Sequence, residues 1–131
     1  MSFGKREYDR QRPEIEFPDH AAPADLVVQD LIVGDGPEAT AGSTVSAHYV
    51  GVAFSTGEEF DASWNRGAPL DFRLGVGQVI AGWDEGIAGM KVGGRRRLEI
   101  PAVKAYGDSG AGAAIAPGEA LIFVVDLVGV R

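Results

Sequence analysis

The stretch VIAGWDEGIAGM (residues 79–90) decides the fold, because its pattern differs from that of the segments around it. Large apolar residues recur there at spacings of three or four, the period of one side of a helix, so we expect a helix over residues 79–90. Gly82, Gly86 and Gly89 weaken it, since each glycine inside a helix costs about 1 kcal/mol relative to alanine. Their missing side chains allow close backbone approach, so we expect a sheet to hold this helix in place.

Strand patterns lie on both sides of the expected helix. From Ser43 onward polar and apolar residues alternate, with Tyr49 on one face and His48 on the other, which is the period of a half-buried strand. Further strands are expected at residues 26–33, 59–61, 70–74, 95–100 and 121–130. Several antiparallel strands and one short helix predict an α+β domain in which a sheet wraps over the helix.

The chain of 131 residues is long enough for one domain with a sizeable core. Residues 1–23 carry mixed charges and prolines without periodicity, so we expect a charged, flexible arm there and a folded domain over residues 24–131. A partner-binding tail is the alternative for the arm, and Ile15, Phe17 and Pro18 could dock on the domain. Residues 101–117 are expected to form a long loop, and such loops often carry function.

Composition excludes several kinds of chemistry. No cysteine is present, which excludes disulfides, thiolate nucleophiles and cysteine-held zinc, and His20 and His48 alone leave little for a metal centre. We therefore expect no metal and no cofactor. The net charge of −7 argues against nucleic acid and anionic membranes as partners. Residues 1–12 lack the apolar stretch of a signal peptide, so we expect a cytoplasmic protein, and we also expect a monomer.

Two glycine motifs have functional alternatives. GDSG (residues 107–110) resembles the sequence around the nucleophile of trypsin-like proteases, but His20 lies in the arm and His48 in a strand, so no catalytic triad is expected. GVG (residues 75–77) precedes the helix, but Ile80 stands where a dinucleotide-binding loop has its third glycine. A tight turn from strand to helix is expected instead.

Charged runs are the remaining motifs. Anion or nucleic-acid contact is one hypothesis for the three arginines at residues 95–97, but alternation along a strand favours a solvated face that protects a sheet edge. Carboxylates are adjacent at residues 58–59 and 84–85, and no pattern brings either pair to a common reacting centre. We expect these carboxylates to be solvated.

The order and spacing of five segments resemble the FKBP-type peptidyl-prolyl cis/trans isomerases: VSAHYVG (45–51), EFDAS (59–63), GVGQVIAGWDEG (75–86), AYG (105–107) and LIFVVDL (121–127). The resemblance covers residues 24–131. It implies the family fold, an antiparallel half β-barrel wrapped around one short α-helix. It also implies rotation of X-Pro bonds in protein folding, with proline-containing polypeptides as substrates and tacrolimus- or rapamycin-type macrolides as ligands.

By this resemblance the active site is an apolar, aromatic pocket with Trp83 as its floor. The implied catalytic residues are Asp61, Tyr106, Phe60 and Tyr49, and the implied substrate-binding residues are Val79, Ile80, Trp83, Phe123, Leu70 and Ile115. Asp61 is expected to be buried. Leu70 stands where an aromatic residue is usual in the best-known members, and Ala111 and Ala114 stand where those members carry larger rim side chains.

Such a pocket can catalyse rotation without covalent chemistry. Twisting a peptide bond breaks amide resonance against a barrier of about 18–20 kcal/mol. The twisted imide loses charge separation, so a dry pocket favours the transition state. The resemblance implies the Ile80 N–H and the Tyr106 hydroxyl as donors to flanking carbonyls, and Asp61 as an orienting charge. The alternative function is a prolyl-binding chaperone or adaptor with little catalytic activity.

Overall fold

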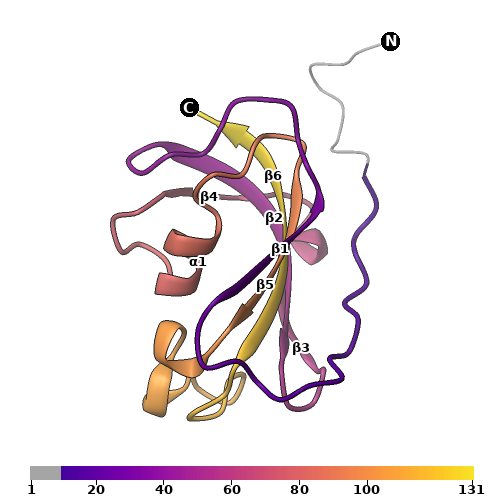
Figure 1. The fold of residues 1–131 in the computed structure, drawn as a ribbon, viewed down its shortest axis with the longest axis vertical. Coiled ribbons are helices and arrows are strands. Elements are labelled where there is room, and N and C mark those ends of the chain that lie inside the picture. Colours follow the sequence, from indigo (N-terminus) through magenta and orange to yellow (C-terminus); the bar gives the residue numbers. More distant parts are fainter. Residues whose placement is uncertain (1–9) are drawn as a thin grey trace.

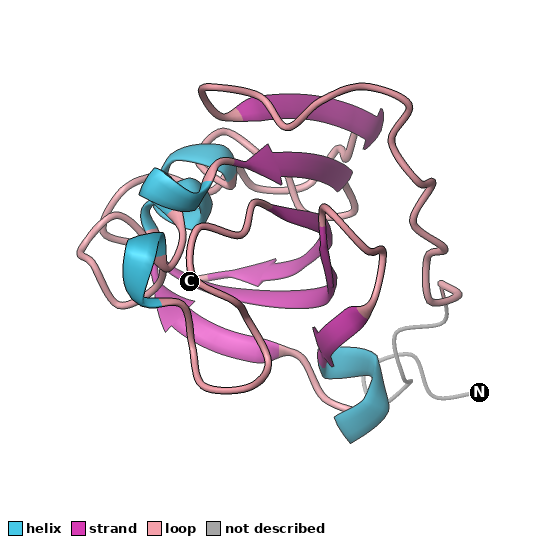
Figure 2. Ribbon diagram, turned by 90° about the horizontal axis from the view of Figure 1, so that it is seen from below, coloured by secondary structure: helices cyan, strands magenta, loops and turns pink. Residues whose placement is uncertain are grey.

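The computed structural model describes residues 10–131, in which an antiparallel sheet curves around a short helix (Figures 1 and 2). The strands are β1 (Val27–Ile32), β2 (Thr44–Ala53), β3 (Glu59–Ala62), β4 (Leu70–Arg73), β5 (Arg95–Ile100) and β6 (Leu121–Val130). The helix α1 is Ala81–Gly86, and three 3-10 helices are η1 (Ser63–Arg66), η2 (Ala102–Lys104) and η3 (Gly107–Ser109). The strand order is β1-β5-β6-β2-β3, and β4 also pairs with β2. The predicted fold class is confirmed.

The helix is shorter than the one predicted over residues 79–90. Ile80 is extended, with ψ 153°, and its carbonyl accepts a hydrogen bond from the Trp83 N–H, so α1 begins only after Ile80. Gly89 has φ +89°, which a right-handed helix cannot contain. The buried side is as predicted, because Trp83 and Met90 are both buried. The apolar period therefore continues through the turns at both ends of α1.

Two glycines of α1 bring its backbone against β5, as the sequence predicted. A Cβ atom on Gly82 would lie 2.5 Å from Cγ2 of Ile100, and one on Gly86 would lie 2.8 Å from Cδ2 of Leu98. Ile100 and Leu98 are fully buried, so neither can move away. A larger residue at either position would push the helix off the sheet.

Strand β2 is buried on both faces, so the prediction of a half-buried strand is wrong. Tyr49 faces the cluster around α1, whereas His48 faces the opposite side and stacks on Trp64 of η1 with ring centroids 4.3 Å apart. The Ser63 hydroxyl lies 2.8 Å from Nδ1 of His48 and accepts a hydrogen bond from the Tyr49 N–H. The helix η1 thus covers a face that alternation alone assigns to solvent.

The three arginines of β5 do not form a solvated edge, which corrects the sequence-based expectation. β5 lies inside the sheet, between β1 and β6. Their ion pairs are Arg95 with Asp126 at 2.8 Å, Arg96 with Asp30 at 2.7 Å and Arg97 with Glu99 at 3.1 Å. Asp126 is fully buried, so its pairing with Arg95 compensates for the loss of hydration.

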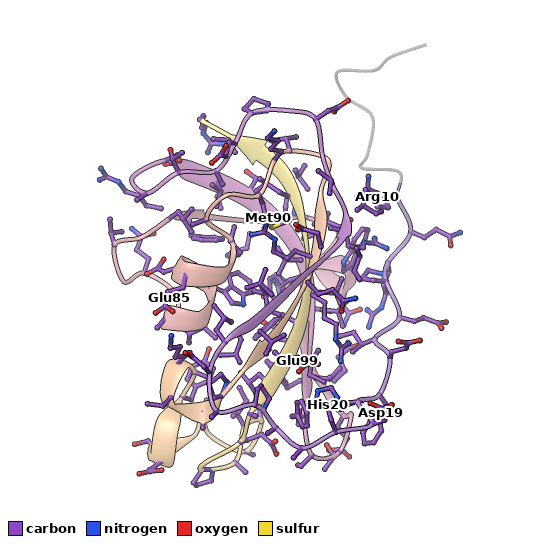
Figure 3. The ribbon with its side chains drawn as sticks, viewed as in Figure 1. Arg10, Asp19, His20, Glu85, Met90 and Glu99 are labelled. Atoms are coloured by element: carbon purple, nitrogen blue, oxygen red, sulfur yellow. The ribbon has the colours of Figure 1, made fainter. Side chains whose placement is uncertain are left out.

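Residues 10–23 run along the face of the sheet opposite α1 (Figure 1). Arg12 contacts Glu59 and Asn65, and His20 Nε2 lies 2.9 Å from Glu99 Oε1, as Figure 3 shows for His20 and Glu99. Ile15 packs against the outer apolar cluster, whereas Phe17 is exposed. Flexibility of the arm stays a prediction, and its first part, residues 1–9, lies outside the described residues.

The segment between β5 and β6 contains η2 and η3 in place of a wholly irregular loop. Ser109, the serine of the GDSG motif, lies in η3, while His20 bonds to Glu99 and His48 to Ser63. The motif therefore has no histidine beside it, as expected. No helix within residues 10–131 is long and apolar enough to cross a membrane.

Candidate active site

A pocket of about 440 Å³ opens between α1, the inner face of β2, β3 and β6, and the segment that carries η2 and η3. Its walls are Tyr49, Phe60, Asp61, Leu70, Gln78, Val79, Ile80, Trp83, Tyr106 and Phe123. The volume lies within the usual range for small-molecule sites, roughly 300–1,000 Å³. The pocket therefore suits a ligand of the size of a few amino-acid residues.

Aromatic rings form the base of this pocket. Trp83 is buried in the base, and its ring centroid lies 4.9 Å from that of Tyr49 and 5.2 Å from that of Phe123. Phe60 meets Phe123 edge to face, at 5.5 Å. Edge-to-face contacts of this kind fix ring positions, so the base is rigid and apolar.

Gly51 of β2 makes the space in which two of these rings stand. A Cβ atom there would lie 2.6 Å from Cε1 of Phe123 and 2.7 Å from Cζ of Phe60. Its backbone does not have a positive φ, so the need for glycine at this position is one of space. The shape of the pocket thus depends on the absence of a Cβ atom at Gly51.

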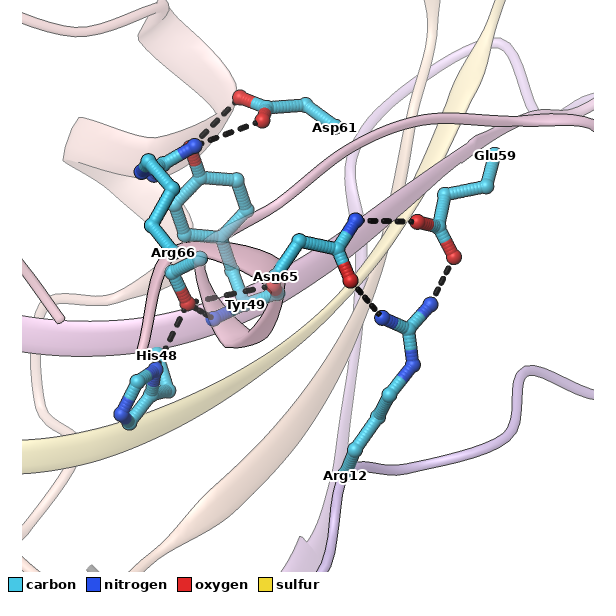
Figure 4. A network of polar contacts seen from close by, with 8 residues as sticks. Arg12, His48, Tyr49, Glu59, Asp61, Asn65 and Arg66 are labelled. Carbon is cyan, nitrogen blue, oxygen red and sulfur yellow. Dashed lines mark hydrogen bonds and ion pairs between the residues drawn. The ribbon is translucent and has the colours of Figure 1, made fainter. Parts of the chain in front are cut away.

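One wall of the pocket is polar and tightly connected (Figure 4). The Tyr49 hydroxyl donates a 2.6 Å hydrogen bond to Oδ2 of Asp61. Arg66 donates to Oδ1 of Asp61 at 3.0 Å and to the Tyr49 hydroxyl at 2.9 Å. Burial, followed by the hydrogen bond to Asp61, raises the pKa of Tyr49 above its ordinary value of 10.0. Tyr49 therefore remains a hydrogen-bond donor at neutral pH.

Arg66 is a site residue that sequence reasoning missed. It lies on η1, five residues after Asp61, and its guanidinium also sits 5.6 Å from the centre of the Tyr49 ring. The spacing DASWNR from Asp61 to Arg66 is the signal that could have found it, since a short helical turn returns the arginine to the carboxylate. Asp61 itself is 44% exposed, so the expectation that it is buried is wrong.

A capped turn precedes Gln78, another residue of the pocket lining. Asp84 of α1 accepts hydrogen bonds from the N–H groups of Gly75 and Gly77, at 2.8 and 3.0 Å. Both glycines have positive φ, as the expected tight turn requires. Gln78 follows Gly77, and its side-chain oxygen accepts a hydrogen bond from the Arg73 N–H at 2.9 Å. Gln78 also lines the pocket, which the sequence did not predict.

Nine of the ten predicted site residues line the pocket: Tyr49, Phe60, Asp61, Leu70, Val79, Ile80, Trp83, Tyr106 and Phe123. Ile115 is not among the lining residues; it is buried in the apolar cluster that also contains Trp83, and it pairs with Ala111 through backbone hydrogen bonds. Ala111 and Ala114 are likewise not among the lining residues. The roles of the nine in the reaction stay predictions.

Two N–H donors at the pocket have no hydrogen-bond acceptor within the part of the chain that the structure describes. Within residues 10–131 the Trp83 indole N–H is buried without a hydrogen-bond partner. The backbone N–H of Ile80 likewise has no acceptor among these residues, although its carbonyl accepts two bonds. An unsatisfied buried donor such as the Trp83 indole N–H is uncommon, whereas the Ile80 N–H belongs to a half-buried residue that lines the pocket.

Comparison with known proteins identifies the family. The model of the FKBP-type peptidyl-prolyl cis-trans isomerase family matches residues 36–128. The chain is 69% identical to an FK506-binding protein of Streptomyces anulatus over 121 residues, which are 92% of this chain and 98% of that protein. It is 45% identical to the peptidyl-prolyl cis-trans isomerase FPR2 of Saccharomyces cerevisiae, over 81% of this chain and 76% of that protein. The crystal structure of AtFKBP13 superposes with a TM-score of 0.76 at 45% identity, covering 84% of this chain and 96% of that one.

This chain belongs to the FKBP-type peptidyl-prolyl cis-trans isomerase family. It is an isomerase that interconverts the cis and trans forms of X-Pro peptide bonds. The family, the fold and the reaction implied by its motifs are confirmed.

Proposed function

We propose that X-Pro bonds rotate in the pocket above Trp83, by desolvation and positioning and without a covalent intermediate. The observation that carries this proposal is the base of edge-to-face aromatic rings beside a single bonded carboxylate. Rotation requires loss of amide resonance, and the twisted imide has less charge separation than the planar one. An apolar base therefore favours the transition state over the ground state.

Each side chain has a role that follows from its position. Val79, Trp83 and Phe123 hold the proline ring, because they form the apolar base and its edge. The Ile80 N–H and the Tyr106 hydroxyl donate hydrogen bonds to the carbonyls that flank the rotating bond. Leu70 contributes apolar surface at the rim. These contacts fix the peptide on both sides of the bond while leaving the bond itself free to turn.

The wall of Phe60, Tyr49 and Asp61 faces the imide carbonyl. Both carboxylate oxygens of Asp61 already accept hydrogen bonds, one from Tyr49 and one from Arg66. Asp61 thus acts as a fixed negative charge that orients Tyr49, and proton transfer is not part of its role. A consequence is a flat pH dependence of turnover between about pH 5 and 8, since acid-base catalysis by a carboxylate or histidine would give a bell-shaped profile.

The ligands and setting follow from the same pocket. We propose proline-containing polypeptides as substrates in protein folding, and tacrolimus- or rapamycin-type macrolides as ligands of this pocket. The bacterial relative's name says that it binds FK506, and the pocket volume of about 440 Å³ fits part of such a ligand. We further propose that the protein works in the cytoplasm as a monomer.

The experiment is a protease-coupled assay with a short prolyl peptide. Wild type is compared with Trp83→Ala, Asp61→Val and the control Asp35→Val, which makes the same aspartate-to-valine change at an exposed loop residue. We expect Trp83→Ala and Asp61→Val to lower kcat/KM about tenfold or more, and the control to match wild type. A tacrolimus-type macrolide should inhibit turnover. If wild type turns the peptide over only at the uncatalysed rate, the chaperone or adaptor alternative is favoured. If Asp35→Val lowers kcat/KM as much as the pocket variants do, the loss of activity does not arise in the pocket.

A further inference from the structure

Strand β1 is an open edge of the sheet. It is the first strand in the order β1-β5-β6-β2-β3, and within residues 10–131 its backbone pairs with β5 alone (Figure 2). An edge strand presents N–H and C=O groups that point away from the sheet. A further strand can therefore add to β1.

The side chains of β1 do not protect this edge. Every residue of the strand is exposed, and its large apolar residues Val27, Val28, Leu31 and Ile32 are 40–46% exposed. Edge strands of other proteins are commonly protected by lysine or proline, which β1 lacks. Its charged residue, Asp30, is paired with Arg96 at 2.7 Å. The edge is therefore apolar on both faces and close to neutral.

A recess lies beside each face of this strand. On the face turned toward the arm, a recess of about 650 Å³ is lined by Gln29 and Leu31 together with arm residues. On the face turned toward α1, a recess of about 70 Å³ is lined by Ile32, Val33 and Met90 together with the charged residues Asp30, Lys91 and Arg96. Successive side chains of a strand point to opposite faces, so an added strand would place them in the two recesses alternately.

The two recesses differ in charge and size. The larger is lined by four carboxylates, Glu14, Glu16, Asp19 and Glu99, against Arg97 and His20. A lysine or arginine side chain complements it, whereas the smaller recess has room for a valine-sized group beside Ile32 and Met90. A second copy of this chain is a poor occupant, because each copy carries a net charge of −7 and the two repel each other.

The edge lies close to the catalytic pocket. Lys104 of η2 bonds to Asp25, just before β1, at 3.0 Å and to Glu85 of α1 at 2.6 Å. Tyr106 of the pocket follows Lys104 by two residues. A client chain that pairs with β1 is thereby held next to the pocket, which raises the effective concentration of its prolyl bonds there.

We propose that the β1 edge is a second polypeptide-binding site, which takes an extended client segment as an added strand, with basic and small apolar residues in alternation. The proposal rests on the isomerase function proposed above. It assigns the edge a role in retaining long substrates, while the pocket acts on the prolyl bond. Short peptides that reach only the pocket are then unaffected by changes in β1.

The first test measures binding of a fluorescent peptide of about ten residues in which lysine and valine alternate, long enough to pair with the whole of β1. We expect it to bind wild type and to bind the variant Val28→Ser/Leu31→Ser about tenfold more weakly, since the variant loses apolar contact area. The control Val76→Ser makes the same kind of change at an exposed residue of the 75–77 turn and should bind as wild type does. A peptide of alternating glutamate and valine should not bind.

A backbone control separates strand addition from simple charge attraction. The lysine-valine peptide with an N-methyl group on every residue keeps its charge but has no backbone N–H to donate from either edge, so we expect its binding to be lost. Equal binding of the methylated peptide would overturn the proposal. A dimer in sedimentation velocity that Leu31→Ser dissociates would also overturn it, because the occupant would then be a second copy.

The second test measures turnover. A prolyl tetrapeptide is compared with the same tetrapeptide joined through a glycine-serine linker to the lysine-valine repeat. In wild type we expect the longer substrate to have a KM about tenfold lower, with kcat unchanged, and in Val28→Ser/Leu31→Ser that advantage disappears. If the two substrates have the same KM in wild type, the proposed edge site is contradicted. If wild type does not turn over the tetrapeptide at all, the proposed isomerase mechanism is contradicted instead. The binding experiment then still tests whether the β1 edge binds peptides.

Discussion

The Tyr49 hydroxyl donates a 2.6 Å hydrogen bond to Oδ2 of Asp61, and Arg66 donates to both residues of this pair. Tyr49 comes from β2 and Asp61 from β3, which are adjacent strands, and Arg66 comes from η1. These hydrogen bonds fix the positions of the three side chains at one wall of the pocket. The charge of Asp61 is thereby held at a fixed position even though the carboxylate is half exposed.

Tyr49→Phe removes the phenolic donor and keeps the ring. Hydrogen bonds to a charged group contribute about 1.5–3 kcal/mol, so we expect kcat/KM to fall about tenfold or more while the circular dichroism spectrum stays unchanged. The protease-coupled assay measures this loss. Because Arg66 binds both partners, the double variant Tyr49→Phe/Arg66→Ala should lose less than the sum of the single losses. Strict additivity would show that the two residues act independently.

Gly51→Ala places a Cβ atom 2.6 Å from Phe123 and 2.7 Å from Phe60. Both rings must shift, so we expect kcat/KM to fall about tenfold, because catalysis depends on ring positions. Overpacking should also lower the free energy of unfolding by about 1–3 kcal/mol, measured by urea titration. Gly129→Ala is the matched control, since its Cβ atom would lie 3.8 Å from that of Ser46. Full activity in Gly51→Ala would contradict a shape-dependent pocket.

Gly82→Ala tests whether close packing or helix propensity decides the stability of α1. Alanine favours a helix by about 1 kcal/mol, but here its Cβ atom would lie 2.5 Å from the buried Ile100. We expect a net loss of about 1–3 kcal/mol in the free energy of unfolding, measured by urea titration. Ile100→Ala, itself destabilising, should be less so in the Gly82→Ala background. A gain in stability from Gly82→Ala would contradict the observed approach of α1 to β5.

The docking of the arm should depend on pH through His20. The hydrogen bonds to Glu99 and then to Asp19 raise the pKa of His20 above its ordinary value of 6.5. Because the docked pKa is raised, the contribution of His20 to docking is fully present below pH 6.5 and is lost as the pH rises through the docked pKa. Arg97 bonds to the same Glu99, and its positive charge opposes protonation of His20.

Backbone order parameters of residues 19–22 from nitrogen-15 relaxation measure this dependence. We expect them to decrease from pH 6 to pH 8 in wild type, as the arm loses its contact with Glu99. His20→Gln keeps a hydrogen-bonding side chain but does not titrate, so its order parameters should be the same at both pH values. A decrease of equal size in His20→Gln would assign the pH effect to another group.

Local patterns were sufficient for most of the strand assignments, because alternation and β-branched residues are signals that lie within a few neighbouring residues. The pocket residues were implied by the resemblance of five spaced segments to the family, and local pattern alone did not place them. The glycines of α1 also indicated the sheet that covers it, since a missing side chain is visible in the sequence. The helix ends were placed less well, because a period of three or four continues through the turns that flank α1.

What the sequence alone determined is thus the strands and the presence of α1, the family and nine of the pocket residues. The tertiary structure decided which elements cover each other. It buried His48 beneath Trp64, placed the arginines of β5 inside the sheet and returned Arg66 to Asp61. It also left the edge of β1 open. These outcomes depend on strand order and on contacts between residues far apart in the chain, which the period of a single segment does not encode.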